Sequence, residues 1–327
     1  MKLSILITHY NETTEEVKCL LDSIYAQQRI DFSEIEVLIL DDVGTVQLDF
    51  DKLFSANYPF KISYSENNQN LKVALSRQKL YEMSNGEYVM YCDADDSFYS
   101  VLALFTIFKE IEKGFDVLVC DFYEEVVNNN DFILLQHTCD KVFIHGKVYR
   151  RKFVDDNDIR WINLCPSEDN YYNKLTQSLG KEVRNIPIPL YLWKYRPNSI
   201  VRSDSANWGM RVFPIASISE ENLIDELFKR KKTGNALYFI ALHIFQCYFQ
   251  LHRPEWDKKE NRFWKDIALQ RVNHFYEKYR PYWDKIAQSD KDAIYRDNEK
   301  AQTARGFVRT ESIEEWLRGI EDYGSNR

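Results

Sequence analysis

The segment YVMYCDADDSFY, residues 88–99, joins an apolar run directly to a cluster of acidic residues. Its first residues are typical of a buried β-strand, and Asp93, Asp95 and Asp96 follow at once. Carboxylates this close repel one another and cost stability unless a cation lies among them. The segment therefore predicts a strand whose carboxyl end binds something positively charged.

Strand and helix patterns alternate around this segment. Apolar runs predict further strands at residues 3–10, 34–42 and 60–66. Apolar residues at helical spacing predict helices at residues 14–28, 70–86 and 99–114. Strands separated by helices of this length imply β-α-β crossovers. The sequence therefore predicts an α/β fold with a Rossmann-like, mainly parallel sheet flanked by helices.

The pattern changes in the second half of the chain. Two strands are predicted around a turn at residues 128–130, then a helix at 166–180 and an extended segment at 183–195. Beyond about residue 205 the spacing is almost entirely helical, with many Trp, Tyr and Phe residues. We therefore expect two domains, an α/β domain at residues 1–204 and an α-helical region at residues 205–327.

Polar residues end three of the predicted strands. They are the run Thr8 to Asn11, the pair Asp41 and Asp42, and the acidic cluster of residues 93–96. In open α/β sheets, ligands bind at the carboxyl ends of the strands. The three strand ends therefore predict one acidic cleft that can form hydrogen bonds.

Charge and composition narrow the class of protein. The net charge is −8, with 22 basic and 32 acidic residues in 1–204 but 21 and 19 in 205–327. An acidic first part argues against a general nucleic-acid groove there. We see neither a signal peptide nor an apolar run long enough to cross a bilayer, and expect a cytoplasmic protein. The six Cys residues form no C-x-x-C pair, which favours reduced thiols.

An Asp-x-Asp sequence at the end of a buried strand suits one particular chemistry. One carboxylate can bind a divalent cation while the other accepts a hydrogen bond from a sugar or ribose hydroxyl. Mg²⁺ and Mn²⁺ prefer oxygen ligands and typically bridge protein carboxylates to phosphates. The missing positive charge at Asp93 and Asp95 is therefore predicted to be a metal ion that carries a nucleoside diphosphate.

Seven blocks along residues 1–205 resemble, in order, those of the family 2 glycosyltransferases of the GT-A fold. The blocks are LSILITHYNE, EVLILDDVGT, NLKVALSRQ, YCDADDSFYS, HGKVYRRKFV, SEDNYYNKL and PLYLWKYRPNSIVRS. The chain departs from the family pattern at Thr8, where Pro is common, at Lys72 for Gly, at Gln78 for Asn and at Ser100 for Pro.

The resemblance implies roles for individual residues. Asp169, with its neighbour Glu168, matches the catalytic base, and Asp95 and Asp93 match the metal ligands. The resemblance also implies a set of nucleotide-sugar ligands: Thr8, Tyr10, Asn11, Asp42, Arg77, Asp93, Ala94, Lys147, Arg150, Arg196 and Ser199. It places nucleotide-sugar binding mainly in residues 1–115 and the acceptor and catalytic part in 116–204.

The resemblance predicts an inverting, metal-dependent glycosyltransferase of the hexosyl or pentosyl type. It implies Mn²⁺ or Mg²⁺ as the cofactor and favours a UDP-sugar as the donor. A non-catalytic binding or assembly protein and a nucleotidyltransferase remain the alternatives. A glycan, a polyol-phosphate polymer and a modified nucleic acid are all open as acceptors. The helical region at 205–327 is expected to bind the acceptor or to form a homo-oligomer.

Overall fold

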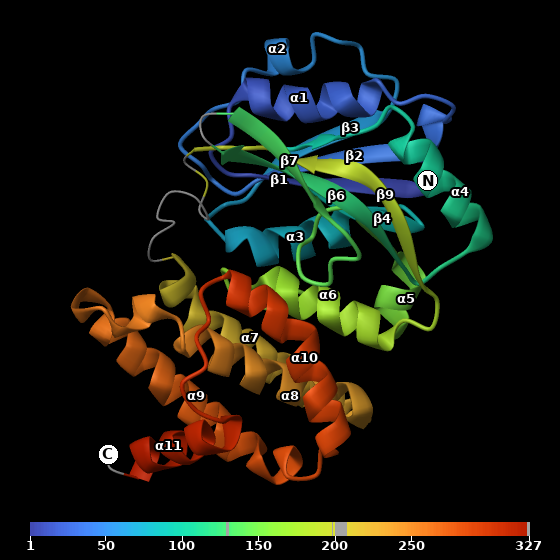
Figure 1. Ribbon diagram of the computed structural model, residues 1–327. Helices are drawn as coiled ribbons and strands as arrows, with labels where there is room; N and C mark the ends of the chain where they lie inside the picture. The colour runs from blue at the N-terminus through green and yellow to red at the C-terminus, as the bar shows by residue number, and fades with distance from the viewer. Residues whose placement is uncertain (129–130, 198, 200–207, 326–327) are drawn as a thin grey trace. The chain divides into compact units, whose positions relative to one another are not determined.

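The computed structural model describes residues 1–128, 131–197, 199 and 208–325. The chain divides into two compact units, Met1–Arg202 and Ser203–Arg327 (Figure 1). The first unit is α/β and the second is helical, so the predicted α/β class with a helical C-terminal region is confirmed. Residues 129 and 130 of the predicted turn lie outside the described residues.

Four strands form the parallel part of the sheet in the first unit. They lie in the order β3 (Lys61–Glu66), β2 (Ile35–Asp41), β1 (Leu3–His9) and β4 (Tyr88–Asp93). All three neighbouring pairs are parallel. Most side chains of β1, β2 and β4 are buried, as expected for a parallel sheet covered on both faces.

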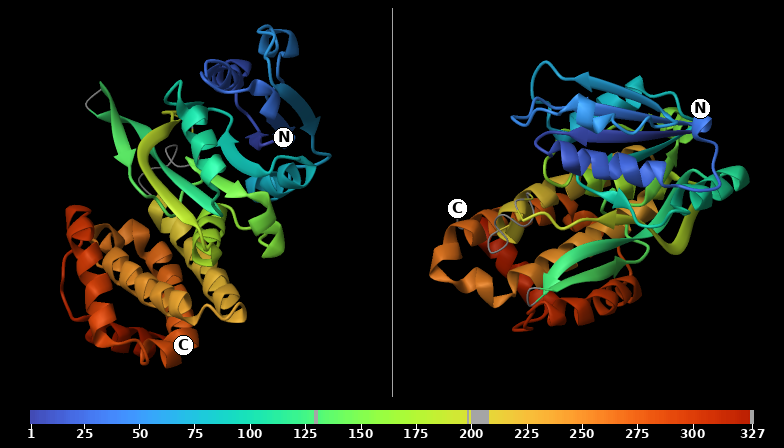
Figure 2. Two further views of the ribbon diagram at one scale, coloured as in Figure 1. Left: turned by 90° about the vertical axis from the view of Figure 1, so that its right-hand side faces the viewer. Right: turned by 90° about the horizontal axis from the view of Figure 1, so that it is seen from above.

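The other side of the sheet is mixed. Its strands are β8 (Lys147–Arg150), β6 (Val117–Asn128), β9 (Val183–Trp193), β5 (Ser97–Phe98) and β7 (Asp131–His137). β8 pairs antiparallel with both β4 and β6, whereas β9 is parallel to β6. β6 and β7 form an antiparallel hairpin (Figure 2). The parallel pairs in the described sheet are therefore those among the first four strands and the pair of β6 with β9.

Helices cover both faces of this sheet, with α1 on one face and α3 and α6 on the other (Figure 1). The helical elements are α1 (Thr14–Tyr25), η1 (Phe32–Glu34), α2 (Phe50–Leu53), α3 (Lys72–Met83), α4 (Ala103–Lys113), α5 (Arg151–Asp156) and α6 (Glu168–Leu179). Thr13 and Glu16 form a capping box that begins α1. Helix α4 begins later than predicted because the chain still follows β9 at residue 99, whose backbone N–H donates to the Leu190 carbonyl at 3.0 Å.

The second unit is built from long helices. They are α7 (Trp208–Lys229), α8 (Thr233–Leu251), α9 (Arg262–Trp283), α10 (Gln288–Ala304) and α11 (Ile313–Ser325), with the short 3₁₀ turns η2 (Pro254–Asp257) and η3 (Lys259–Asn261). The aromatic residues noted in the sequence form much of its core, since Tyr248, Trp256 and Phe275 are buried. Among the residues that the structure describes, no helix is both long and apolar enough to span a membrane.

Candidate active site

The ends of three parallel strands come together at one edge of the sheet. Strand register places Thr8 of β1 beside Asp93 of β4, and His9 of β1 beside Asp41 of β2. His9 is fully buried, and its Nδ1 lies 2.8 Å from Asp41 Oδ2. The predicted convergence of the polar strand ends is therefore present in the structure.

The three aspartates after β4 lie in different environments. Asp96 is fully buried, and its carboxylate accepts hydrogen bonds from the Tyr191 hydroxyl at 2.8 Å and from the backbone N–H of Lys194 at 2.9 Å. Burial and the charges of Asp95 and Asp93 raise the pKa of Asp96 well above its ordinary value. Asp96 therefore ties the acidic loop to β9.

Asp93 and Asp95 face more open surroundings. Burial would raise the pKa of Asp93, but the charge of Arg77, whose Nη2 lies 2.8 Å from Asp93 Oδ1, outweighs it and the pKa is lowered. Burial and the negative charges of Asp93 and Glu12 raise the pKa of Asp95 to about 6, although Arg196 opposes the shift. The Asp95 side chain is 21% exposed, so its carboxylate can be reached from solvent.

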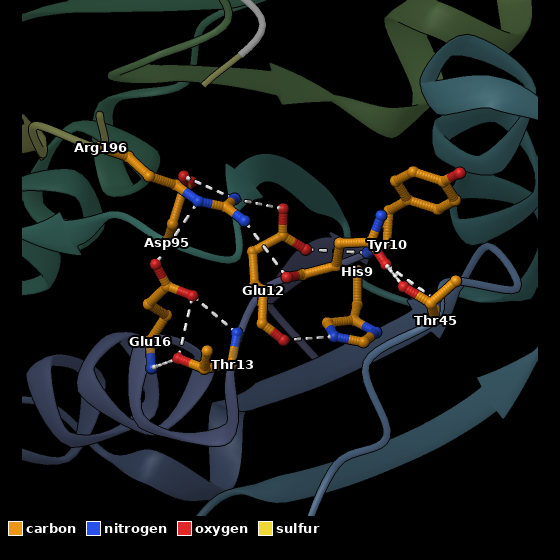
Figure 3. Close-up of polar contacts among 9 residues, drawn as sticks. His9, Tyr10, Glu12, Thr13, Glu16, Thr45, Asp95 and Arg196 are labelled. Atoms are coloured by element: carbon orange, nitrogen blue, oxygen red, sulfur yellow. Dashed lines mark hydrogen bonds and ion pairs between the residues drawn. The ribbon is translucent and has the colours of Figure 1, made fainter. Parts of the chain in front are cut away.

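Arg196 reaches this loop from the segment that follows β9 (Figure 3). Its Nη1 lies 3.3 Å from Asp95 Oδ2 and 3.0 Å from Glu12 Oε1. Its Nη2 donates a hydrogen bond to the backbone carbonyl of Asn11 at 3.2 Å, and its Nε lies 3.5 Å from Glu16 Oε1. The turn between β1 and α1 and the acidic loop therefore share one guanidinium.

The predicted nucleotide ligands from the first strands lie on the same turns. Asp42 is buried, and its Oδ1 accepts hydrogen bonds from Asn67 Nδ2 and from the backbone N–H of Leu71, both at 2.8 Å. Asn11 Oδ1 accepts one from the backbone N–H of Thr45 at 2.7 Å. The Tyr10 ring, by contrast, is 46% exposed at this end of the sheet. Asp42 and Asn11 therefore order the loops around the strand ends, and the Tyr10 ring is open to a ligand.

Arg77 of α3 links the acidic loop to the start of α6. Besides its bond to Asp93, it donates through Nη1 to Glu168 Oε1 at 3.1 Å. Arg77 is almost completely buried, and its guanidinium lies 5.1 Å from the centre of the Trp161 ring. The predicted catalytic residues and the predicted metal ligands are thus joined through one arginine.

Glu168 and Asp169 are the first two residues of α6. Burial and the neighbouring charge of Glu168 raise the pKa of Asp169 to about 7, against the opposing charge of Arg77. Burial also raises the pKa of Glu168. Ser167, directly before them, has a left-handed φ of 99°, which is uncommon for a residue other than glycine and is often found at functional sites.

The remaining predicted ligands do not all lie at the acidic loop. The backbone N–H of Ser199 donates to the Arg196 carbonyl at 3.1 Å, close to the site, and Ala94 is buried beneath the loop. Lys147 is fully buried, and its ammonium group donates to the Phe143 carbonyl and lies 3.3 Å from Asp140. Strand register places Arg150 beside Tyr88, at the opposite end of β4 from Asp93, where it pairs with Asp116.

The structure brings in residues that the sequence interpretation did not select. Glu12 contacts Arg196, and Tyr191 holds Asp96. His145 is buried close to Asp93 and Asp96, and one ligand atom from each of the three lies within 4.8 Å of the others. Glu12 adjoins the predicted Asn11, and Tyr191 falls within a family block, but neither residue type signalled a role in the sequence alone.

Two groups of residues could hold a divalent cation. Asp95 and Asp93 offer partly exposed carboxylates, which fit Mg²⁺ or Mn²⁺. The group of Asp93, Asp96 and His145 is less suited, because Asp96 is already hydrogen-bonded twice and has a raised pKa. The contact between Asp95 and the Arg196 guanidinium shows that a positive group can be accommodated at this carboxylate.

Comparisons with known proteins identify what the chain is similar to. A sequence profile described as Glycosyl transferase family 2 matches residues 4–172, just over half of the 327-residue chain. The protein named Uncharacterized glycosyltransferase YibD, from Escherichia coli (strain K12), is 28% identical over 121 residues, which is 37% of this chain and 33% of YibD. The match thus spans about a third of the length of that curated relative.

Solved structures share the fold at low sequence identity. TarS 1-349 of S. aureus has a TM-score of 0.60 at 18% identity, over 94% of this chain and 93% of TarS. Its complex with UDP-GlcNAc gives 0.61 at 19% identity, with the same coverage. The mannosyltransferase PcManGT from Pyrobaculum calidifontis, in complex with GDP-Man and Mn²⁺, gives 0.52 at 13% identity, over 87% of this chain and 88% of PcManGT.

At these identities the structural matches establish a shared GT-A architecture, while the family follows from the profile. The profile spans the parallel strands, the Asp-x-Asp loop and the start of α6. The chain therefore belongs to glycosyl transferase family 2.

Proposed function

We propose that the protein is an inverting, metal-dependent glycosyltransferase that moves a sugar from a UDP-sugar to a hydroxyl group of an acceptor. The observation that carries the proposal is the buried arginine, Arg77, that joins Asp93 to Glu168 beside Asp169. It donates through one nitrogen to Asp93, a proposed metal ligand, and through another to Glu168, the neighbour of the proposed base Asp169. Direct displacement at an anomeric carbon needs these two features near each other.

The donor is proposed to lie along the carboxyl ends of β1, β2 and β4. In this proposal Thr8, Tyr10, Asn11 and Asp42 bind the nucleoside, and Asp93 contacts the ribose or the sugar. Asp95 binds Mn²⁺ or Mg²⁺, which when bound neutralises charge on the diphosphate leaving group. Arg196, which contacts Asp95, and Ser199, whose backbone N–H donates to the Arg196 carbonyl, are proposed to contact the same diphosphate. Lys147 and Arg150 are not included, because both are engaged elsewhere.

Asp169 is proposed as the base that takes the proton from the acceptor hydroxyl. A general base works best when its pKa lies near the working pH, and burial raises the pKa of Asp169 to about 7. Glu168 raises that pKa through its negative charge, while Arg77 limits the rise. A carboxylate with this pKa is about half ionised at neutral pH, and its ionised form is basic enough to accept a proton.

The donor sugar and the acceptor remain to be found by experiment. The structures of TarS with UDP-GlcNAc and of PcManGT with GDP-Man make those two donors the first to test. The acceptor is proposed to be a glycan or a polyol-phosphate polymer, with modified nucleic acid as a further choice. The helical unit at 203–327 is proposed to bind this acceptor or to form an oligomer.

The test is a donor screen that follows release of free nucleotide. Wild type and the variants Asp95→Asn, Asp169→Asn and Asp51→Asn are compared with each UDP-, GDP-, CMP- and dTDP-sugar, with and without Mn²⁺. Asp51 is an exposed carboxylate on α2 and serves as the matched control. We expect metal-dependent hydrolysis of one donor, lost in Asp95→Asn and kept in Asp51→Asn. If wild type neither hydrolyses nor binds any donor, the alternative of a non-catalytic protein replaces the proposal.

A further inference from the structure

Each carboxylate of the Asp-x-Asp sequence has its own arginine. Arg77 lies 2.8 Å from Asp93, and Arg196 lies 3.3 Å from Asp95. The two arginines differ in how they are held. Arg77 is 6% exposed and comes from helix α3, whereas Arg196 is 24% exposed and comes from the segment after β9, outside any helix or strand. Arg196 is therefore the partner that can be exchanged.

Arg196 lies where three carboxylates converge. Its Nη1 contacts both Asp95 Oδ2 and Glu12 Oε1, and its Nε faces Glu16 Oε1 at 3.5 Å (Figure 3). Like charges this close repel one another unless a cation lies among them. The guanidinium of Arg196 supplies that cation. It does so at an oxygen of Asp95, the residue proposed as the direct metal ligand.

Glu12 is held in place from both of its ends. Its Oε2 accepts a hydrogen bond from the backbone N–H of Tyr10 at 2.8 Å, and its carbonyl oxygen lies 2.9 Å from His9 Nε2. His9 is in turn fixed to Asp41 at the end of β2. The Glu12 carboxylate is therefore held in place by the turn to which it belongs. It can still pair with the Arg196 guanidinium when that guanidinium leaves Asp95.

We infer that Arg196 is a built-in counter-cation that competes with the divalent metal ion for Asp95, and that Glu12 holds it beside the site. The inference rests on the proposed function, because it takes Asp95 as the metal ligand. A metal ion and a guanidinium repel each other at the same carboxylate oxygen, so metal binding requires Arg196 to move. The donor diphosphate offers Arg196 a second anion, and metal and donor therefore bind better together than either does alone.

The experiment measures binding of Mn²⁺ alone by calorimetry, without donor. Arg196→Met keeps an unbranched side chain that matches the stem of arginine and removes the guanidinium with its charge. Arg184→Met is the control, because Arg184 lies at the start of β9, pairs with Glu110 and loses the same charge far from the site. We expect Mn²⁺ to bind Arg196→Met at least about fivefold more tightly than wild type, within the usual range of coupling between sites. The affinity of Arg184→Met should stay within about twofold of wild type.

A second titration, of UDP in the presence of Mn²⁺, should move in the opposite direction. Loss of the guanidinium removes a contact to the diphosphate, so Arg196→Met should bind UDP more weakly than wild type. Arg196→Gln, measured in parallel, repeats both titrations if the Met variant does not fold. A residue that only stabilised the loop would weaken UDP binding without strengthening the binding of Mn²⁺ alone.

The outcomes separate this inference from the proposed function. If wild type and Arg196→Met bind Mn²⁺ alone with equal affinity, or if neither binds it until UDP is added, the counter-cation role is wrong and the glycosyltransferase proposal stands. If no variant binds Mn²⁺ even with UDP, the proposed metal dependence fails and this inference fails with it. If Arg196→Met binds Mn²⁺ more tightly than wild type in the absence of UDP, the result supports both the counter-cation role and the proposed metal dependence.

Discussion

Arg77 Nη2 lies 2.8 Å from Asp93 Oδ1, and this ion pair, in which the arginine is buried and the carboxylate partly exposed, fixes the acidic loop at the end of β4 against helix α3. The same guanidinium donates to Glu168 at the start of α6. Three elements that are distant in the sequence therefore depend on one side chain. Removal of that side chain would leave Glu168 buried without its ionic partner.

Replacement of Arg77 by Met should lower the free energy of unfolding by about 3 kcal/mol, because breaking a buried charge pair leaves uncompensated charge. Urea unfolding measures this change. The control is Arg184→Met, whose more exposed pair with Glu110 should contribute less than about 1 kcal/mol. Equal effects of the two substitutions would contradict the structural role assigned to Arg77.

Asp95→Asn should stabilise the protein at neutral pH. The pKa of Asp95 is raised to about 6 by burial and by its acidic neighbours, so the folded state binds a proton more readily than the unfolded state. Its ionised form therefore costs stability above pH 6, and that cost disappears as the pH falls toward 4. We expect the variant to gain about 1 to 2 kcal/mol at pH 7.5, and less at pH 5.

Thermal unfolding of wild type and Asp95→Asn at both pH values measures this difference. Asp51→Asn, an exposed substitution, should show no such pH dependence. A variant that is less stable than wild type at pH 7.5 would mean that the pairing of Asp95 with Arg196 outweighs the repulsion.

Asp169→Asn should abolish turnover while UDP affinity in the presence of metal stays within about threefold of wild type. For wild type, kcat/KM should fall about tenfold per pH unit below pH 7, because the base must be ionised and burial raises the pKa of Asp169 to about 7. This expectation is tested by measuring kcat/KM as a function of pH with the donor that the screen identifies. An acid limb near pH 4 would show that another group accepts the proton.

Lys147→Met and Arg150→Met should change stability rather than donor binding. Lys147 donates to Phe143 and contacts Asp140 inside the protein, and Arg150 pairs with Asp116 at the far end of β4. We expect UDP affinity within about twofold of wild type for both, and a loss of about 1 to 2 kcal/mol in stability for Lys147→Met. Calorimetry with UDP and Mn²⁺ checks the first point. A tenfold loss of UDP affinity in either variant would restore the phosphate-binding role that the resemblance implied.

Local patterns in the sequence predicted much of the first unit. Apolar runs predicted the strands β1, β2 and β4, and polar residues marked where each run ended. Helix α6 followed from the residues at its two ends, Pro166 and Ser167 before it and Gly180 after it. The short strand β5 was missed, since two residues carry no periodicity and pair only with the distant β9. The mixed pairing around β8 was missed for the same reason, because strand direction depends on the path of the whole chain.

By itself, the sequence determined the α/β class, the polar strand ends and the acidic loop, because hydrophobic periodicity and clustered carboxylates are local properties. The tertiary structure decided which charges meet. It paired Arg77 with Glu168 across 91 positions and Arg196 with Glu12 across 184, and it buried Lys147 against Asp140 and the Phe143 carbonyl. A lysine or arginine in a sequence motif could pair with any of several acidic residues in the same chain. Only the strand register and the packing of the helices select one of them.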